Sequence, residues 1–162
     1  SGNLEKSRFI YDLGEIAGIS FLLYGKGGEA AANGSNVSWK GVYAPHTLPA
    51  VAEGSFGLVW DGDSTEGAGG VFGSYMPYIF HHKVSLYLLA GLPIFVYAKA
   101  GSAAYVLEKE LGWAIERLGD MPGRIESIPA EEYERVAANV RREALVLAGG
   151  RQLLQALQSF SF

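Results

Sequence analysis

The chain has no cysteine, little positive charge and no long apolar run. Without cysteine it can form neither a disulfide framework nor a thiolate metal site, and a reducing compartment is permitted, so we expect a cytoplasmic location. The 13 Lys and Arg residues are outnumbered by 17 Asp and Glu, which argues against a nucleic acid as the main partner, because clustered cations bind phosphate backbones. No apolar run approaches the roughly 20 residues that span a bilayer, and the segment Ser1 to Glu5 is not a signal peptide. We therefore expect no transmembrane segment.

Apolar runs alternate with amphipathic stretches along the whole chain. With 162 residues, 49% of them hydrophobic, the chain can bury one core but is too short for two ordinary domains, so we interpret residues 1–162 as one domain. Strands are predicted at 19–24, 36–43, 56–60, 94–97 and 113–115. Helices are predicted at 6–16, 48–52, 82–90, 103–111, 129–139 and 142–157. This alternation, with strands that are continuously apolar, predicts an α/β fold with a Rossmann-like parallel sheet and helices on both faces.

The order of these elements predicts that the sheet lacks its first strand. A doubly wound domain begins with a strand that enters its first helix through a glycine-containing turn, and this sequence begins at such a turn, Gly2-Asn3-Leu4. The absent strand would lie in the middle of the sheet, so we expect a fragment of a larger protein. Its absence would leave edges exposed beside the strands at 19–24 and 56–60, and because unpaired edges favour self-association, a homo-oligomer is among the expected partners.

The segment from His81 to Tyr97 carries the strongest functional signal. An apolar helix begins near His82, stops at Gly91-Leu92-Pro93 and is followed directly by a buried strand. Lys83 and Ser85 fall in the first turn of that helix, where unpaired backbone N–H groups and the positive end of the helix dipole favour an anion. This pattern predicts a ligand that carries phosphate.

Four segments are expected to meet at the carboxyl ends of the strands, where open parallel sheets bind ligands: residues 2–8, 39–45, 61–78 and 82–85. Within the first of them, Lys6 and Arg8 are explained equally well as solvated charges on a helix. We expect a role in binding for Lys83, because a lysine between a glycine-rich loop and an apolar helix is hard to explain as part of a surface face.

The glycine-rich acidic loop from Asp61 to Gly73 is long for a compact domain, so we expect it to be functional or mobile. Asp61, Asp63 and Glu66 could act as acids or bases, although a solvated acidic loop is the commoner explanation. The His81-His82 pair does not predict a metal site, because adjacent residues on a helix do not share a face and no third ligand follows at helical spacing.

Four motifs occur along the chain in the order in which one known family carries them. They are Gly2-Asn3-Leu4-Glu5-Lys6-Ser7, Asn36-Val37 through Gly41, Leu58-Val59-Trp60-Asp61-Gly62, and His82-Lys83-x-Ser85-Leu86-Tyr87-Leu88 with Ala90-Gly91-x-Pro93. Together they resemble the C-terminal, donor-binding half of bacterial two-domain glycosyltransferases, a group that includes galactofuranosyltransferases and the streptococcal glucosyltransferase acting on serine-rich adhesins. The resemblance implies a GT-B fold, in which a UDP-sugar lies between two Rossmann-like halves and no metal or other cofactor is required.

The resemblance also implies roles for individual residues. Lys6 and Lys83 would neutralise the diphosphate and stabilise the leaving group, Ser85 would hydrogen-bond the diphosphate, and Trp39 would lie near the uracil. The full nucleotide-binding set implied is Asn3, Lys6, Trp39, Tyr78, His82, Lys83 and Ser85, with Asp61 as a sugar contact. The chain departs from the family in three places: Trp39 replaces a common tyrosine, Ile79-Phe80-His81 replaces two asparagines and a proline, and Thr47 replaces an acidic residue.

These observations lead to one functional hypothesis and two alternatives. The hypothesis is the donor-binding half of a metal-independent hexosyltransferase that uses a UDP-hexose, such as galactofuranose, glucose or galactose, to extend a bacterial glycan. The general base and the acceptor site would lie in the missing N-terminal half, so the fragment alone would be inactive. The alternatives are a catalytically silent glycosyltransferase-like partner used for oligomer contacts, and an unrelated nucleotide-binding regulatory domain.

Overall fold

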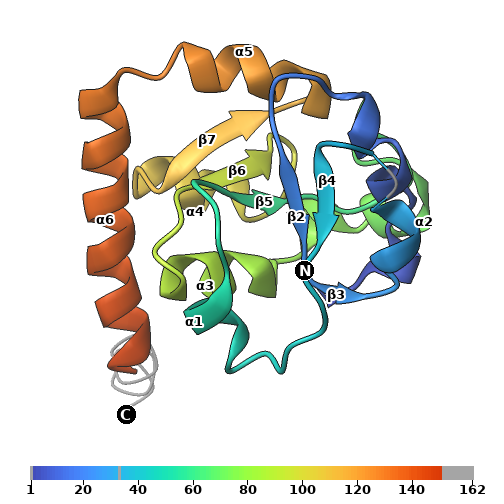
Figure 1. Ribbon diagram of the computed structural model, residues 1–162. Helices are drawn as coiled ribbons and strands as arrows, with labels where there is room; N and C mark the ends of the chain where they lie inside the picture. Colours follow the sequence, from blue (N-terminus) through green and yellow to red (C-terminus); the bar gives the residue numbers. More distant parts are fainter. Residues whose placement is uncertain (1, 33, 151–162) are drawn as a thin grey trace.

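The computed structural model describes residues 2–32 and 34–150, which form a mixed α/β structure (Figure 1). Its strands are β1 (Gly2–Asn3), β2 (Phe21–Leu23), β3 (Gly25–Lys26), β4 (Val37–Trp39), β5 (Gly57–Val59), β6 (Ile94–Tyr97) and β7 (Gly112–Ile115). Its α-helices are α1 (Leu48–Val51), α2 (Gly70–Gly73), α3 (His82–Leu89), α4 (Ala103–Glu108), α5 (Met121–Glu126) and α6 (Ala130–Ala148). Every strand pair in the described residues is parallel, as the sequence predicts.

Strands β5, β6 and β7 form a sheet that is covered on both faces. Alternate residues of β6 enter different core clusters: Phe95 packs with Trp113 and Met121 on one face, whereas Ile94 and Val96 pack with residues of α3 and α4 on the other. Helix α6 contributes to both clusters, through Val136 and Val140 respectively. The central strand is completely buried from Ile94 to Val96, as expected for a parallel strand between two layers.

The N-terminal region builds two short ladders of its own. Strand β2 pairs with β4, and β1 pairs with β3, which follows β2 in the chain after Tyr24. Within the described residues no ladder joins β2 to β5. The predicted single sheet is therefore present in separate pieces. Gly25 belongs to strand β3, because its backbone pairs with Gly2.

The predicted helix at 6–16 is wrong. This segment forms three successive 3₁₀ turns, η1 (Leu4–Lys6), η2 (Arg8–Tyr11) and η3 (Leu13–Glu15). The chain breaks at Ser7, whose hydroxyl donates to Asp61, and the N–H of Phe9 donates to the carbonyl of Gly62. The backbone of Ser7, with φ −114° and ψ 81°, is not helical, so no continuous α-helix passes through it.

Two other predicted elements differ from the structure. The predicted break between helices near residue 140 does not exist, because α6 runs unbroken and the completely buried Val140 extends its apolar stripe. The rest of the predicted final helix, residues 151–157, lies outside the described residues. The predicted loop at 61–73 ends in the short helix α2, and it is tied to the core by hydrogen bonds from Trp60 Nε1 to Ser64 and from the Leu118 N–H to Thr65. A further 3₁₀ turn, η4 (Glu29–Ala31), precedes β4, η5 (Met76–Tyr78) follows α2, and η6 (Leu118–Asp120) precedes α5.

The predicted helix stop after α3 is confirmed. The helix ends at Leu89, and Gly91 adopts a left-handed φ of 74°, which glycine reaches without the strain of a Cβ. The N–H of Leu92 then donates to the carbonyl of Tyr87 and closes the final turn. The chain therefore passes directly from α3 into β6. In the described part of the chain, no helix has the length and apolarity that a membrane crossing demands.

Candidate functional site

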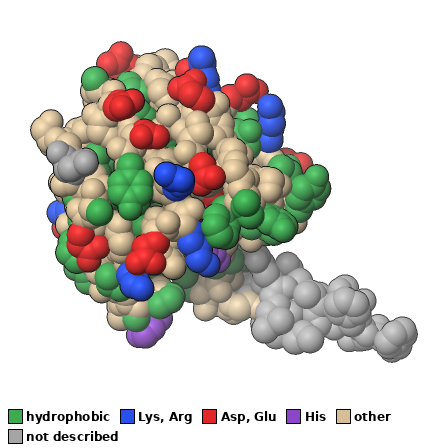
Figure 2. All heavy atoms as spheres, turned by 90° about the vertical axis from the view of Figure 1, so that its right-hand side faces the viewer, with side chains coloured by type: hydrophobic (Ala, Val, Ile, Leu, Met, Phe, Trp, Pro, Cys, Tyr) green, Lys and Arg blue, Asp and Glu red, His purple; other side chains and the backbone are tan. Residues whose placement is uncertain are grey.

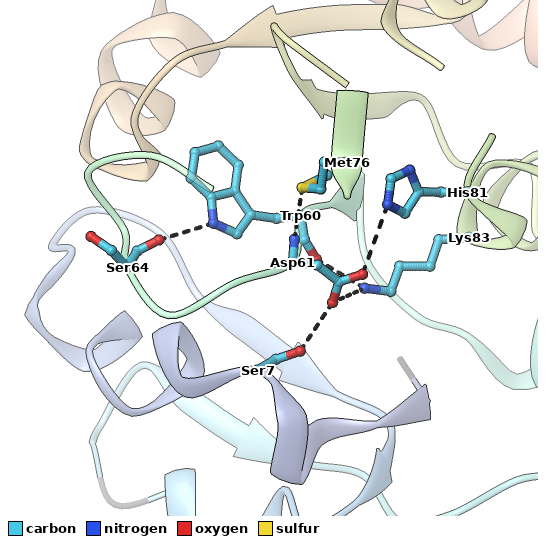
Figure 3. Close-up of polar contacts among 7 residues, drawn as sticks. All are labelled: Ser7, Trp60, Asp61, Ser64, Met76, His81 and Lys83. Carbon is cyan, nitrogen blue, oxygen red and sulfur yellow. Dashed lines mark hydrogen bonds and ion pairs between the residues drawn. The ribbon is translucent and has the colours of Figure 1, made fainter. Parts of the chain in front are cut away.

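Four polar side chains meet where β5 ends and α3 begins: Ser7, Asp61, His81 and Lys83 (Figure 3). Trp60 and Asp61 follow β5, and Lys83 lies in the first turn of α3. The buried side chains of Val84 and Leu88 anchor α3 in the core and thereby fix the position of Lys83. The cluster lies at the carboxyl end of a parallel strand, the edge where the sequence predicts a ligand.

Lys83 is the most buried cation of the cluster, with only 6% of the residue exposed. Its ammonium donates to the Trp60 carbonyl at 2.9 Å and to Asp61 Oδ1 at 2.8 Å. An ammonium has three protons, so these two contacts leave one donor for a further acceptor. A cation at a helix N-terminus is opposed by the helix dipole, and the carboxylate of Asp61 offsets this effect.

Asp61 is held as a carboxylate by its neighbours. Burial raises the pKa of its carboxyl, but the charge and hydrogen bond of Lys83 together with the hydrogen bond from Ser7 outweigh burial, and the net pKa is lowered. The Ser7 hydroxyl donates to Oδ1 at 3.0 Å, and Lys83 donates to the same oxygen. Asp61 therefore occupies the position beside Lys83 and the start of α3 that an anion favours.

His81 is buried beside this pair without a hydrogen-bond partner for either ring nitrogen among the described residues. Its Nε2 lies 3.9 Å from Asp61 Oδ2, which is too long for a hydrogen bond. Burial and the charge of Lys83 lower the pKa of the imidazole, against the opposing effect of Asp61. His81 is therefore neutral near pH 7, and its contact with Asp61 is not an ion pair there.

The other predicted site residues of the N-terminal region lie in different environments. Lys6 is exposed, and its ammonium lies 5.5 Å above the ring of Phe72, within cation–π range. Asn3 is exposed on β1 and accepts a hydrogen bond from the N–H of Glu5. Trp39 is only partly buried on β4, but its Nε1 donates to the Gly25 carbonyl at 2.9 Å, so its polar group is used within the fold.

The residues on and before α3 that were predicted to bind the nucleotide do not lie on one face. His82 is exposed, and Tyr78 on η5 is 84% exposed. Ser85 lines a cavity with Phe80, Tyr105 and other residues, whereas Lys83 lines a different cavity. Two positions along a helix rotate a side chain by about 200°, so Lys83 and Ser85 cannot share a face. The structure thus brings Lys83 and Asp61 together and leaves the Ser85 side chain elsewhere.

Sequence reasoning missed Ser7 and His81 as members of the cluster. Ser7 is only 4% exposed and His81 only 3%. For Ser7 a signal was available, since it ends the motif that begins at Gly2. For His81 the available signal was its place immediately before the α3 start. Both residues were missed because they were interpreted from their neighbours in the sequence, whereas the residue that each of them contacts, Asp61, is distant in the chain.

The surface beside the cluster mixes apolar and charged side chains. Figure 2 shows the face on which α2 lies, where hydrophobic, acidic and basic side chains are interspersed. Val71, Phe72, Tyr75 and Tyr78, on and after α2, are exposed. The described residues contain no group of three or more His, Asp or Glu side chains that could hold a metal ion.

The fold and this cluster define a parallel α/β protein with a buried cation at a helix start, a geometry suited to anionic ligands. The chain belongs to the family described as "Glucosyltransferase 3-like, C-terminal domain", whose model matches residues 1–160. It is thus a glycosyltransferase C-terminal domain.

Individual relatives agree with this membership. The chain is 32% identical over 145 residues to the beta-1,6-galactofuranosyltransferase WbbI of Escherichia coli (strain K12), covering 87% of this chain and 42% of the relative. It is 30% identical over 120 residues to glucosyltransferase 3 of Streptococcus gordonii, covering 72% of this chain and 34% of the relative. Glucosyltransferase 3 of Streptococcus parasanguinis is 25% identical over 103 residues, 64% of this chain and 29% of the relative. The chain spans less than half the length of each of these relatives.

Proposed function

We propose that the chain is the donor-binding half of a hexosyltransferase of GT-B type and holds a UDP-hexose for transfer to a glycan acceptor. Membership of a glucosyltransferase family supports the reaction class, and the similarity to a galactofuranosyltransferase and to glucosyltransferases supports a hexose donor. The observation that carries the proposal is Lys83, a buried cation aligned with the start of α3 at the carboxyl end of β5.

In this proposal the donor diphosphate lies against the start of α3. The third proton of the Lys83 ammonium and the N–H groups of the first turn would contact it, and Lys6 would approach from the exposed side near Phe72. These cations would stabilise the leaving diphosphate without a metal ion. Asp61 would hold Lys83 in position. Asn3, Tyr78 and His82 are exposed and free to turn toward a nucleotide, whereas Trp39 and Ser85 would need to change their surroundings.

One observation favours a second candidate, the catalytically silent partner. The charge of Lys83 is already compensated by Asp61, so the pair can be explained as a structural ion pair that binds nothing. The two candidates differ in whether the chain binds UDP. The silent partner would keep the fold and the ion pair without nucleotide affinity.

Calorimetric titration of UDP into the chain and its variants tests the proposal. We expect Lys83→Ala to weaken UDP binding about tenfold to a hundredfold, because a charge-assisted hydrogen bond contributes about 1.5–3 kcal/mol. Lys6→Ala should weaken it less, because Lys6 is exposed. Lys109→Ala is the matched control: this lysine lies beyond α4, 3.9 Å from Glu143, and should leave the affinity unchanged.

Lys26 is not a suitable control, because it is paired across β1 and β3 with Asn3, one of the residues expected to bind the nucleotide. A second experiment compares the affinities of Asp61→Asn for UDP and for a UDP-hexose. If Asp61 contacts the sugar, this variant should lose more affinity for the UDP-hexose than for UDP. A folded wild-type chain that binds no UDP, or equal affinities for wild type and Lys83→Ala, would remove the donor-binding role.

A further inference from the structure

A cavity of about 440 Å³ lies between β2 and β5. Residues of both strands line it, including Leu22 on β2 and Leu58 on β5, and aliphatic and aromatic side chains such as Ile10, Phe56 and Leu92 complete most of its wall. Its volume falls within the range of about 300–1,000 Å³ that is usual for ligand sites. Unlike a typical ligand site, however, it is bordered by two strands that no described strand joins.

Each of these strands has one unpaired edge, and both edges face the cavity. In β2 the N–H of Phe21 donates to Asn36, and the carbonyl of Leu23 accepts from Lys40, so these residues are turned toward β4. In β5 the N–H of Gly57 donates to Pro93, on the side of β6. Alternate residues of a parallel strand turn to opposite neighbours. The intervening residues, Leu22 and Leu58, therefore present their N–H and C=O groups toward the cavity.

Strand β1 shows how this gap is filled. Gly2 pairs with Gly25 and Asn3 with Lys26, in parallel, and the N–H of Gly2 donates to the carbonyl of Tyr24 at 3.1 Å. Tyr24 and Leu22 are turned to the same edge, away from β4. A strand that reached Gly2 in the same register would therefore run along β2 on the side of the cavity.

We infer that the cavity is the seat of an extended apolar strand that runs into Gly2 and pairs in parallel with both β2 and β5. The strand order becomes β4, β2, the added strand, β5, β6 and β7, which is the doubly wound order 3-2-1-4-5-6. A strand between two others with core on both faces has apolar side chains on both faces, and this matches the apolar cavity wall. The inference rests on the gap and the β1 register, and it does not depend on the proposed donor binding.

Hydrogen exchange on extended chains tests this inference. One variant carries about five valines and isoleucines before Ser1, a usual strand length. A second carries serines and glycines, and a third repeats the apolar extension with prolines at alternate positions, which cannot donate to a neighbouring strand. We expect only the first to slow exchange of the Leu22 and Leu58 amides, by about tenfold or more, and to raise Tm by about 5 °C or more.

Several results would overturn the inference. One is equal protection by the apolar and the serine-glycine extensions, and another is no protection by either. Protection that increases with protein concentration would show that a second copy fills the gap instead. If the apolar extension aggregates, the same sequence is added to the unextended chain as a separate peptide. Slowed exchange of both the Leu22 and the Leu58 amide that saturates with peptide concentration supports the inference. Unchanged exchange of both amides contradicts it. So does a peptide that binds without slowing their exchange and is displaced by a small apolar ligand.

Discussion

The described chain has two regions of parallel strands, β5 to β7 and β1 to β4, and they differ in how fully other elements cover the strands. From β5 to β7, three strands make one continuous ladder, and helices and core side chains cover both faces. From β1 to β4, ladders of two and three residues are linked by 3₁₀ turns, and β2 borders a cavity. The first region is stabilised by burial on both sides. The second relies on contacts with residues 61–62 of the loop after β5.

The largest difference between the regions should appear when a buried side chain is truncated. Phe95 on β6 is completely buried, with its ring 5.1 Å from that of Phe56 and 5.5 Å from that of Trp113. We expect Phe95→Ala to cost about 3–5 kcal/mol of unfolding free energy. Ile10 is equally buried but lines the cavity, where neighbours have room to move, so Ile10→Ala should cost about 2 kcal/mol. Urea unfolding measures both, and a larger loss for Ile10→Ala would contradict the comparison.

A matched pair of glycines tests the ladders themselves. A Cβ on Gly112 would collide with the Ile94 carbonyl, and a Cβ on Gly25 would collide with the Gly2 carbonyl. Gly112→Ala should cost about 3 kcal/mol, because it separates β7 from the central strand. Gly25→Ala should release only β1, but Gly25 also has a φ of 139°, where a Cβ strains the backbone, so the total cost should be about 2 kcal/mol. Thermal unfolding compares the variants, and exchange of the Gly2 amide shows whether β1 has detached. Equal losses in Tm would mean that both ladders belong to one cooperative unit.

The ion pair between Lys83 and Asp61, whose carboxylate also accepts the hydrogen bond from Ser7 of the other region, should have an intermediate effect. Lys83→Met removes the cation from Asp61, whose side chain is only 26% exposed, and should cost about 1–3 kcal/mol, below the range for a fully buried pair. Adding Asp61→Asn should recover part of the loss, because no unpaired carboxylate is then left. A double-mutant cycle in urea gives the coupling energy. A value near zero would show that the two side chains do not stabilise one another.

The smallest effect concerns pH and His81. Because the folded-state pKa of His81 is lowered, the unfolded chain binds its proton first, and stability falls as the pH drops through about 6.5 toward the lower folded value. The lowered pKa of Asp61 acts in a separate window, below its ordinary value of 3.8. We expect Tm to fall between pH 7 and 5 in the wild type and to fall less in His81→Gln. Parallel slopes for the two proteins would show that His81 does not titrate on unfolding.

Local patterns in the sequence were sufficient to predict the region from β5 to β7. The apolar run at 94–97 and the glycine at the end of α3 determine structure within a few residues, and both are confirmed. The parallel pairing was predictable for the same reason, since helices alternate with continuously apolar strands. The sequence alone also located Lys83 at the start of a helix and near Asp61.

The region from β1 to β4 was less predictable because its structure depends on distant contacts. The apolar spacing of Phe9, Ile10 and Leu13 fits a helix, but Ser7 and Phe9 are bound to the loop after β5, and this pairing leaves no local trace. The role of Ser85 in binding stays a prediction from its place in the first turn, and its side chain lines a different cavity from that of Lys83. Sequence spacing shows which residues lie in the same helical turn, but residues of one turn point in different directions, so spacing alone does not show which of them line the same site.

Helix α6 has a consequence for the order in which this protein can assemble. It follows every strand in the chain, yet it supplies Val136 to one core cluster and Val140 to the other, and it packs against α3. During synthesis the apolar faces of the sheet therefore stay partly uncovered until α6 has left the ribosome. Closing the core then requires contacts between residues far apart in sequence, which slows folding. The emerging chain is most exposed to chaperones, proteases and aggregation in the interval between β7 and α6.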